Sequence, residues 1–410
     1  MDFKVKYQYT YFIYPYLIEE KKYQNYLYQL LKNPKCKLKL FDRKKDVGID
    51  TYFLPELKDK MFWSLEMSKS SIKQYETMDK KMRATMISKQ ACNIFEYEIE
   101  GDIPGKIGEK DGIFFDIIKM EIICFNTGVS FLLIKTALSE GQQLSDVLNF
   151  NYKLRSIVSK TEHSKQYEAI KIQTAKLNNM EEFSKLIEKI VGPNLEAKQI
   201  NLDTDRLITY SYTCLDQADW NEKVDIKLLE KEFEKYRKIK PAGEQIEDVT
   251  LKEQSVYQEK YLYYGFSDNT TVLLTCDKNI KNYTTLPFSY ENEQLYHYIF
   301  NIYKKIYLKK LNYQLQQNKK FEIVKEKFLN FAKKDWIYEI TNDEMGKTLE
   351  EHYAKEQTLM KNFEKLKQQY DILYKDYEIE KNKKSNKWIL RIIVAMVILN
   401  IINMIIIFSK

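Results

Sequence analysis

An apolar stretch near the C-terminus, from Trp388 to Phe408, is the feature that most constrains how this chain can fold. Arg391, Asn400 and Asn403 are the three interruptions in it. A helix over these 21 positions would be about 31 Å long, which matches the hydrocarbon core of a bilayer. A buried helix of this length in a globular protein would normally keep a polar face, and this stretch has none. The sequence therefore predicts one transmembrane helix over residues 388–408.

A basic cluster directly before this stretch predicts its orientation; it consists of Lys381, Lys383, Lys384 and Lys387. Lys and Arg are enriched in the cytoplasmic flanks of membrane helices, so we expect the preceding residues to lie in the cytoplasm. The same lysines are expected to contact anionic lipid head groups. The first residues lack a basic region followed by an uninterrupted apolar run, so we expect no signal peptide. The predicted location is the cell membrane, with a single span, a cytoplasmic N-terminus and the lipid bilayer as a partner.

Composition predicts a folded, reduced protein before the span. Of the 410 residues, 44% are hydrophobic and 30% are charged, as in ordinary globular chains. The net charge of +7 is modest for this length, so nucleic acid is not an expected partner. The five cysteines are scattered without a C-x-x-C pair, which favours free cytosolic thiols over disulfides or a zinc site.

Strand and helix patterns alternate over residues 1–285, which predicts an α+β or mixed α/β cytoplasmic domain. The expected strands are Phe3–Ile18, Cys36–Phe41, Asn93–Glu100, Ile113–Phe125, Val129–Leu138 and Arg206–Cys214, followed by a hairpin over Tyr261–Cys276. The expected helices are Glu19–Lys32, Leu144–Ile157, Met180–Val191 and Val224–Ile239. We expect an irregular region up to Gln90 and a surface loop over Gly101–Gly112.

Residues 286–387 read as a helical stalk, since strand signals end and apolar residues recur at helical spacing. Its last part carries an apolar seam at steps of four and three, formed by Leu359, Phe363, Leu366, Tyr370, Leu373 and Tyr377. Such a heptad pattern predicts self-association of the chain into a homo-oligomer close to the membrane. The alternative is that this helix packs on helices of its own domain. Extended straight onward, the seam points to a different face of the span, so stalk and span need not form one rod.

Two amides lie inside the predicted span. Asn400 and Asn403 share a stripe with Ile393, Met396 and Ile407 at steps of three and four. Amides facing lipid are unfavourable, so we expect them to face another helix or water. Two interpretations remain open, which are hydrogen bonding between the helices of an oligomer and a polar ring in a pore.

The order of elements resembles the CorA-like cation-transporter superfamily over Asn93–Phe408. The similarity lies in a cytoplasmic α/β domain followed by long helices that enter the membrane at the C-terminus, with helical stretches beginning at Tyr296 and Phe328. The family's transporters have two membrane helices and a Gly-Met-Asn signature, whereas this chain has one predicted span and the reversed pair Asn403-Met404. The resemblance implies an oligomeric cation channel or transporter, and it assigns no selectivity residue here.

No catalytic or metal-binding pattern is apparent in the sequence. Gly101–Gly108 is one residue too short for a phosphate-binding Walker loop and lacks its hydroxyl residue. The three histidines, His163, His297 and His352, are too far apart for a local metal-ligand pattern. We therefore expect no enzyme, identify no cofactor, and expect a ligand-gated or degenerate cation channel with a small-molecule or ion ligand. The alternative is a tail-anchored scaffold or effector, for example in defence signalling, that conducts nothing.

Overall fold

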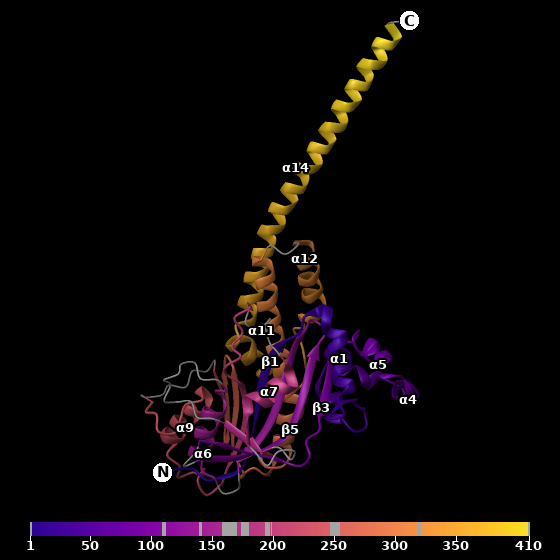
Figure 1. The fold of residues 1–410 in the computed structure, drawn as a ribbon. Coiled ribbons are helices and arrows are strands. Elements are labelled where there is room, and N and C mark those ends of the chain that lie inside the picture. The colour runs from indigo at the N-terminus through magenta and orange to yellow at the C-terminus, as the bar shows by residue number, and fades with distance from the viewer. Residues whose placement is uncertain are drawn as a thin grey trace.

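The computed structural model describes residues 2–108, 112–138, 142–157, 170–173, 180–192, 197, 199–246, 255–317 and 321–408. A large twisted sheet forms the centre of the body, helices cover both of its faces, and one long helix projects away from it (Figure 1). This arrangement confirms the predicted mixed α/β class with a long apolar helix at the C-terminal end.

The sheet is built around β1 (Val5–Leu17), the strand that the aromatic N-terminal pattern predicts. It pairs antiparallel with β6 (Val129–Leu138) on one side and with β9 (Ile208–Leu215) on the other. The predicted hairpin between β5 (Ile113–Phe125) and β6 is present, and it turns at Gly128 with a φ of +84°. A Cβ there would lie 2.1 Å from the Ile18 carbonyl oxygen, so this turn requires glycine.

The remaining strands extend the sheet on both sides. They are β2 (Cys36–Leu38), β3 (Cys92–Tyr97), β4 (Ile103–Ile107), β7 (Ile170–Gln173), β8 (Met180–Glu182), β10 (Val256–Glu259), β11 (Leu262–Ser267) and β12 (Thr270–Cys276). The predicted hairpin over 261–276 is confirmed as β11 and β12, and β12 runs parallel to β9.

The expected loop over residues 101–112 is wrong in part, because β4 lies inside it and pairs with β5. Pro104 and Gly105 hide this strand in the sequence. A Cβ at position 105 would lie 2.2 Å from the ring of Phe115, so the glycine allows two strands to approach around that ring. Residues 109–111 lie outside the described part of the chain.

One face of the sheet is covered by the helices that the N-terminal domain was expected to supply. They are α1 (Tyr23–Lys32), α6 (Leu144–Leu154), α7 (Phe183–Val191) and α9 (Ile226–Lys238). Phe150 of α6, for example, packs edge-on against Phe12 of β1 with 5.7 Å between ring centroids. These helices bury their apolar sides against the strands, as their periodicity predicts.

The opposite face is covered by helices from the predicted stalk. They are α10 (Thr285–Ser289), α11 (Leu295–Gln316) and α13 (Glu344–Glu356), and α12 (Phe321–Asn330) and the first part of α14 (Leu359–Phe408) pack in turn on α11. The ring of Tyr303 in α11 stacks on Phe125 of β5 at 3.8 Å between centroids. Sheet and stalk helices therefore share one hydrophobic core across residues 285 and 286.

The expected irregular region before Gln90 instead contains four short helices. They are α2 (Val47–Tyr52), α3 (Pro55–Met61), α4 (Lys69–Thr77) and α5 (Lys80–Ile87). Ser68 and Asp79 cap α4 and α5 by accepting hydrogen bonds from backbone N–H groups of the first turn. These helices are too short to show a clear apolar period in the sequence.

The described residues also contain short 3₁₀ and π helices. The 3₁₀ turns are Glu20–Lys22, Trp63–Glu66 and Ile280–Asn282, and the π turns are Tyr290–Gln294 and Phe331–Asp335.

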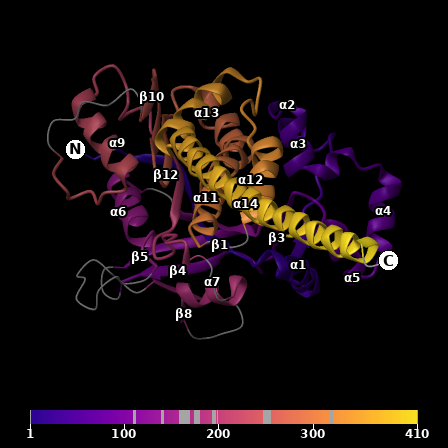
Figure 2. The ribbon, with the colours of Figure 1, turned by 90° about the horizontal axis from the view of Figure 1, so that it is seen from above.

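Helix α14 is continuous over 50 residues, which corresponds to about 75 Å. Its lower part lies beside α11, and its upper part extends alone from the body (Figures 1 and 2). The break that the sequence allowed between residues 382 and 387 is absent. Stalk and predicted span are one helix.

Candidate functional site

The inner half of α14, from Leu359 to Tyr377, packs inside the chain. Leu359, Phe363, Leu366 and Tyr370 of the predicted seam are all buried. The ring of Phe363 stacks on Trp336 at 4.3 Å and also contacts Phe328 of α12 at 5.8 Å. Four positions of the expected self-association seam are thus filled by the chain's own helices, which is the alternative that the sequence left open.

The seam ends with two partly covered residues. Leu373 is half-buried against the same core, and Tyr377 contacts the ring of Phe321 at 5.4 Å and donates a hydrogen bond to Glu322. A second copy could contact the buried side chains of this seam only if α12 moved away from α14.

The outer half runs from Glu378 to Phe408, and its side chains from Glu378 to Ile406 are exposed. The apolar segment in it is long and apolar enough to cross a membrane, and none of its most apolar window is buried. Trp388 and Leu399 are 64% and 60% exposed. An apolar surface this large, left uncovered by the described part of the chain, is typical of a membrane or protein contact.

The basic cluster of Lys381, Lys383, Lys384 and Lys387 lies on this half, with all four side chains exposed. Trp388 follows Tyr377 by 11 residues, so about 16 Å of helix separates the last contact with the body from the apolar segment. Bilayer head-group regions are about 5–8 Å thick on each side. The lysines are therefore placed where head groups would meet the helix if the segment spans a bilayer.

Asn400 and Asn403 are both exposed and lie one turn apart on α14. They follow Trp388 by 12 and 15 residues, or about 18 and 22 Å, which is about 3 and 7 Å beyond the middle of a 30 Å hydrocarbon layer. The structure brings them onto one face together with Ile393 and Met396, as predicted from the spacing.

A buried ion network that the sequence analysis missed ties α13 to α11. The carboxylate of Glu350 in α13 accepts hydrogen bonds from His297 at 2.7 Å, Asn301 at 2.5 Å and Lys304 at 3.0 Å. The three partners are spaced by four and three residues, so they form one stripe on α11. The other ring nitrogen of His297 lies 2.9 Å from the hydroxyl of Tyr52.

Burial acts to raise the pKa of Glu350, but the Lys304 charge and the hydrogen bonds from His297 and Asn301 outweigh it and lower the pKa to about 2. The carboxyl is therefore ionised at neutral pH. Because α13 ends at Glu356 and α14 begins at Leu359, this network fixes the base of the long helix. The stripe of polar residues on a buried helix was the signal that could have found it.

A second network ties the sheet to the start of α11. Glu121 of β5 is 1% exposed and accepts hydrogen bonds from Lys39 at 2.9 Å and from the hydroxyl of Tyr296 at 3.3 Å. Burial acts to raise the pKa of Glu121, but the charges of Lys39 and Lys119 lower it overall. Together the two networks connect the sheet, α11 and α13 through hydrogen bonds to Glu121 and Glu350.

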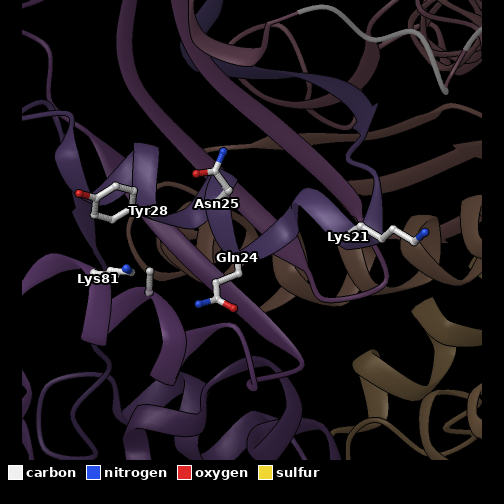
Figure 3. Close-up of a pocket in the computed structure, with 6 residues that line it drawn as sticks. Lys21, Gln24, Asn25, Tyr28 and Lys81 are labelled. Carbon is white, nitrogen blue, oxygen red and sulfur yellow. The ribbon is translucent and has the colours of Figure 1, made fainter.

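A shallow groove of about 400 Å³ lies between α1 and α5 (Figure 3). It is lined by Lys21, Gln24, Asn25, Tyr28, Lys81 and Ala84. Gln24 donates a hydrogen bond to Thr85 at 2.8 Å, which joins the two helices across the groove. Its polar, basic lining suits a small anionic molecule better than an apolar one.

Metal and thiol chemistry receive little support from the described residues. Among them, no group of three or more His, Cys, Asp and Glu side chains could hold a metal ion. The five cysteines are free and buried. Burial raises the pKa of Cys36 to about 11 and that of Cys124 to about 12, so these thiols are poor nucleophiles at neutral pH. His163 lies outside the described residues.

Comparison with protein-family models, curated proteins and solved structures finds no match to this chain.

Proposed function

We propose that this protein is an oligomeric, CorA-like membrane protein in which a cytoplasmic body controls a cation-conducting span. The observation that carries the proposal is the continuity of α14, which is rooted in the core of the body at one end and is fully exposed and apolar at the other. A rigid helix of this kind would transmit a change in the body to the membrane without a flexible joint.

The contacts around α11 support such coupling. Glu121 links the sheet to Tyr296 of α11, and Glu350 links α11 to α13. A ligand that changes the distance between α11 and α13 would move the base of α14. The change would be a switch between two packings, because leaving one partner of a buried ion pair without the other is costly. The basic groove between α1 and α5 is the candidate site for a small-molecule ligand of the body.

Asn400 and Asn403 would line the conducting path. Amides at mid-membrane depth are tolerated where they meet water or another helix. A ring of them around an axis would keep a constriction wet, whereas an apolar ring would close by dewetting. The orientation with the body in the cytoplasm rests on the lysine cluster before the span.

A second candidate is a tail-anchored scaffold that conducts nothing. The same amides favour it, because hydrogen bonds between helices require no pore and contribute about 0.6 to 2 kcal/mol each. In that case the span would only hold and assemble the bodies at the membrane surface.

Reconstitution into liposomes separates the two candidates. We expect K⁺ or Mg²⁺ flux through the full-length protein in the presence of a metabolite extract, and its loss in the N400L/N403L variant. The I401L/I405L variant is the matched control, since it changes apolar residues on another face of the helix. Tight liposomes under all conditions, with an intact oligomer, would favour the scaffold.

A further inference from the structure

A stripe without charged residues runs along the outer half of α14. It includes Asn400 and Asn403 and extends towards the N-terminus beyond the apolar segment. It consists of Ile379, Asn382, Asn386, Ile389, Ile393, Met396, Asn400, Asn403 and Ile407, at alternating steps of three and four. This spacing is the heptad pattern of the a and d positions in a coiled coil. Ile379 and Ile389 are each 51% exposed, so nothing in the described chain covers the stripe there.

The charged residues around the stripe are sorted away from it. Residues 378–391 contain seven charges, which are Glu378, Glu380, Lys381, Lys383, Lys384, Lys387 and Arg391. None occupies a stripe position, although the stripe crosses the most basic part of the helix. A solvated helix surface shows no such sorting, whereas a helix that packs against another does.

The stripe faces away from the body. Ile379 follows Tyr377 by two residues, which at about 100° per residue turns it roughly 200° around the axis. The face of α14 that packs on α12 and the stripe are therefore on opposite sides of the helix. A partner on the stripe near Ile379 would therefore approach α14 from the side opposite α12.

The residues beside the stripe fit a parallel copy of the same helix. Glu378 and Lys383 occupy the flanking g and e positions, five residues apart, which is the spacing of the ion pair between neighbouring parallel helices. Glu378 accepts a hydrogen bond from Tyr374 and keeps further acceptor sites on its carboxylate. Copies of one chain enter a membrane in the same orientation, so their helices are parallel by necessity.

From these observations we infer that the stripe from Ile379 to Ile407 is the interface with a second copy of this chain, paired in parallel and in register. Asn382, Asn386, Asn400 and Asn403 then meet their equivalents and satisfy their amides, which also fixes the register. This inference rests on the proposed membrane insertion and replaces the buried seam at Leu359–Tyr370 as the site of self-association. It does not require conduction.

Cysteine cross-linking of the full-length protein in liposomes tests this interface. We expect oxidation to link copies of I379C and of N386C. The matched controls K381C and K384C lie on the opposite face and should link at least about tenfold less, because their thiols are too far apart for an S–S bond. The native cysteines are buried, so the unmodified protein provides the background.

A charge exchange gives a second, independent readout. In the I379C background, E378K or K383E alone should lower cross-linking about two- to fivefold, as expected for one exposed ion pair. The E378K/K383E double variant should restore it. Equal cross-linking on both faces, or none on the stripe, would overturn the inference. Cross-linked but non-conducting liposomes would leave the interface standing and remove the pore.

Discussion

The two halves of α14 are one helix in two environments. The inner half places Phe363 and Leu366 in the core of the body, and its outward positions, such as Ile372, are exposed. The outer half buries none of its described side chains within the chain, yet it is the more apolar of the two. The partner of an apolar residue on this helix therefore depends on its position. Below Tyr377 it is another helix of the same chain, and above Tyr377 it is, as we propose, lipid or a second copy.

This difference explains why the same heptad spacing marks packing within the chain in the inner half and, as we propose, contact with a second copy in the outer half. Heptad steps of four and three mark a helix that buries a stripe, and they do not identify what covers it. Below Tyr377 the cover is Phe321, Phe328 and Trp336 of the same chain. Above it, the stripe lies on the opposite face, which no side chain of the described residues covers.

The largest expected effect is that of removing the outer half. Ending the chain after Lys387 should turn a membrane-bound protein into a soluble one, because the apolar segment is lost while the packed half is kept. The thermal unfolding temperature of the remaining body should stay within a few degrees of that of the full chain. Fractionation followed by a melting curve measures both, and an insoluble or unfolded product would contradict the division into two halves.

The next largest effect is expected from a substitution that creates a cavity in the packed inner half. Phe363→Ala should lower the free energy of unfolding by about 3–5 kcal/mol, because the ring is packed against Trp336 and Phe328. The control Ile372→Ala, at a position 62% exposed, should change it by less than about 0.5 kcal/mol. Denaturant titration of both variants makes the comparison. Similar effects at both positions would mean that the inner half is not packed as described.

The Glu350 network should contribute a pH-dependent stability of about 3 kcal/mol, from a pKa lowered from about 4.5 to about 2. Because the folded-state pKa is depressed, this stabilisation is fully present above about pH 5 and is lost as the pH falls towards 2. The Glu350→Gln variant should be less stable at pH 7 and should lack that slope. Unfolding curves from pH 7 to pH 3 test it, and parallel pH profiles of variant and parent would contradict the role of this carboxylate.

The smallest effect concerns one lysine of the basic cluster. In the chain that ends after Lys387, Lys384→Gln should weaken binding to anionic vesicles by about 1 kcal/mol, or roughly fivefold. Binding to neutral vesicles should be unchanged, which serves as the control. A sedimentation assay with both lipid compositions measures the ratio, and an equal loss on neutral vesicles would exclude a head-group contact.

Much of the fold could be predicted from the sequence because its strands and longer helices carry strong periodic patterns. The paired strands β5 and β6, the hairpin of β11 and β12, and α9 follow directly from such patterns. β4 was hidden by Pro104 and Gly105, whose role depends on the ring of a residue in the neighbouring strand. α2 to α5 are short and owe their order to tertiary packing more than to local preference.

Site residues that are close together in the sequence could be predicted, whereas those that the fold brings together from distant parts of the chain could not. Asn400 and Asn403 are neighbours on one helix, so spacing alone places them together. Glu350 of α13 meets His297 of α11 although the two residues are 53 positions apart in the chain, and no sequence pattern joins them. The burial of tyrosines could not be predicted from their abundance either. Tyr9 and Tyr210 are buried, and their hydroxyls donate hydrogen bonds to backbone carbonyls.

The central claim, that the outer half of α14 crosses a membrane with the body on the cytoplasmic side, is tested most directly by thiol labelling in intact cells. A cysteine placed at Ser409 should react with a membrane-impermeant maleimide from outside. A cysteine at Ile280, which is 74% exposed on the body, should react only after the cells are permeabilised. Labelling of both positions, or of neither, before permeabilisation would contradict the proposed topology.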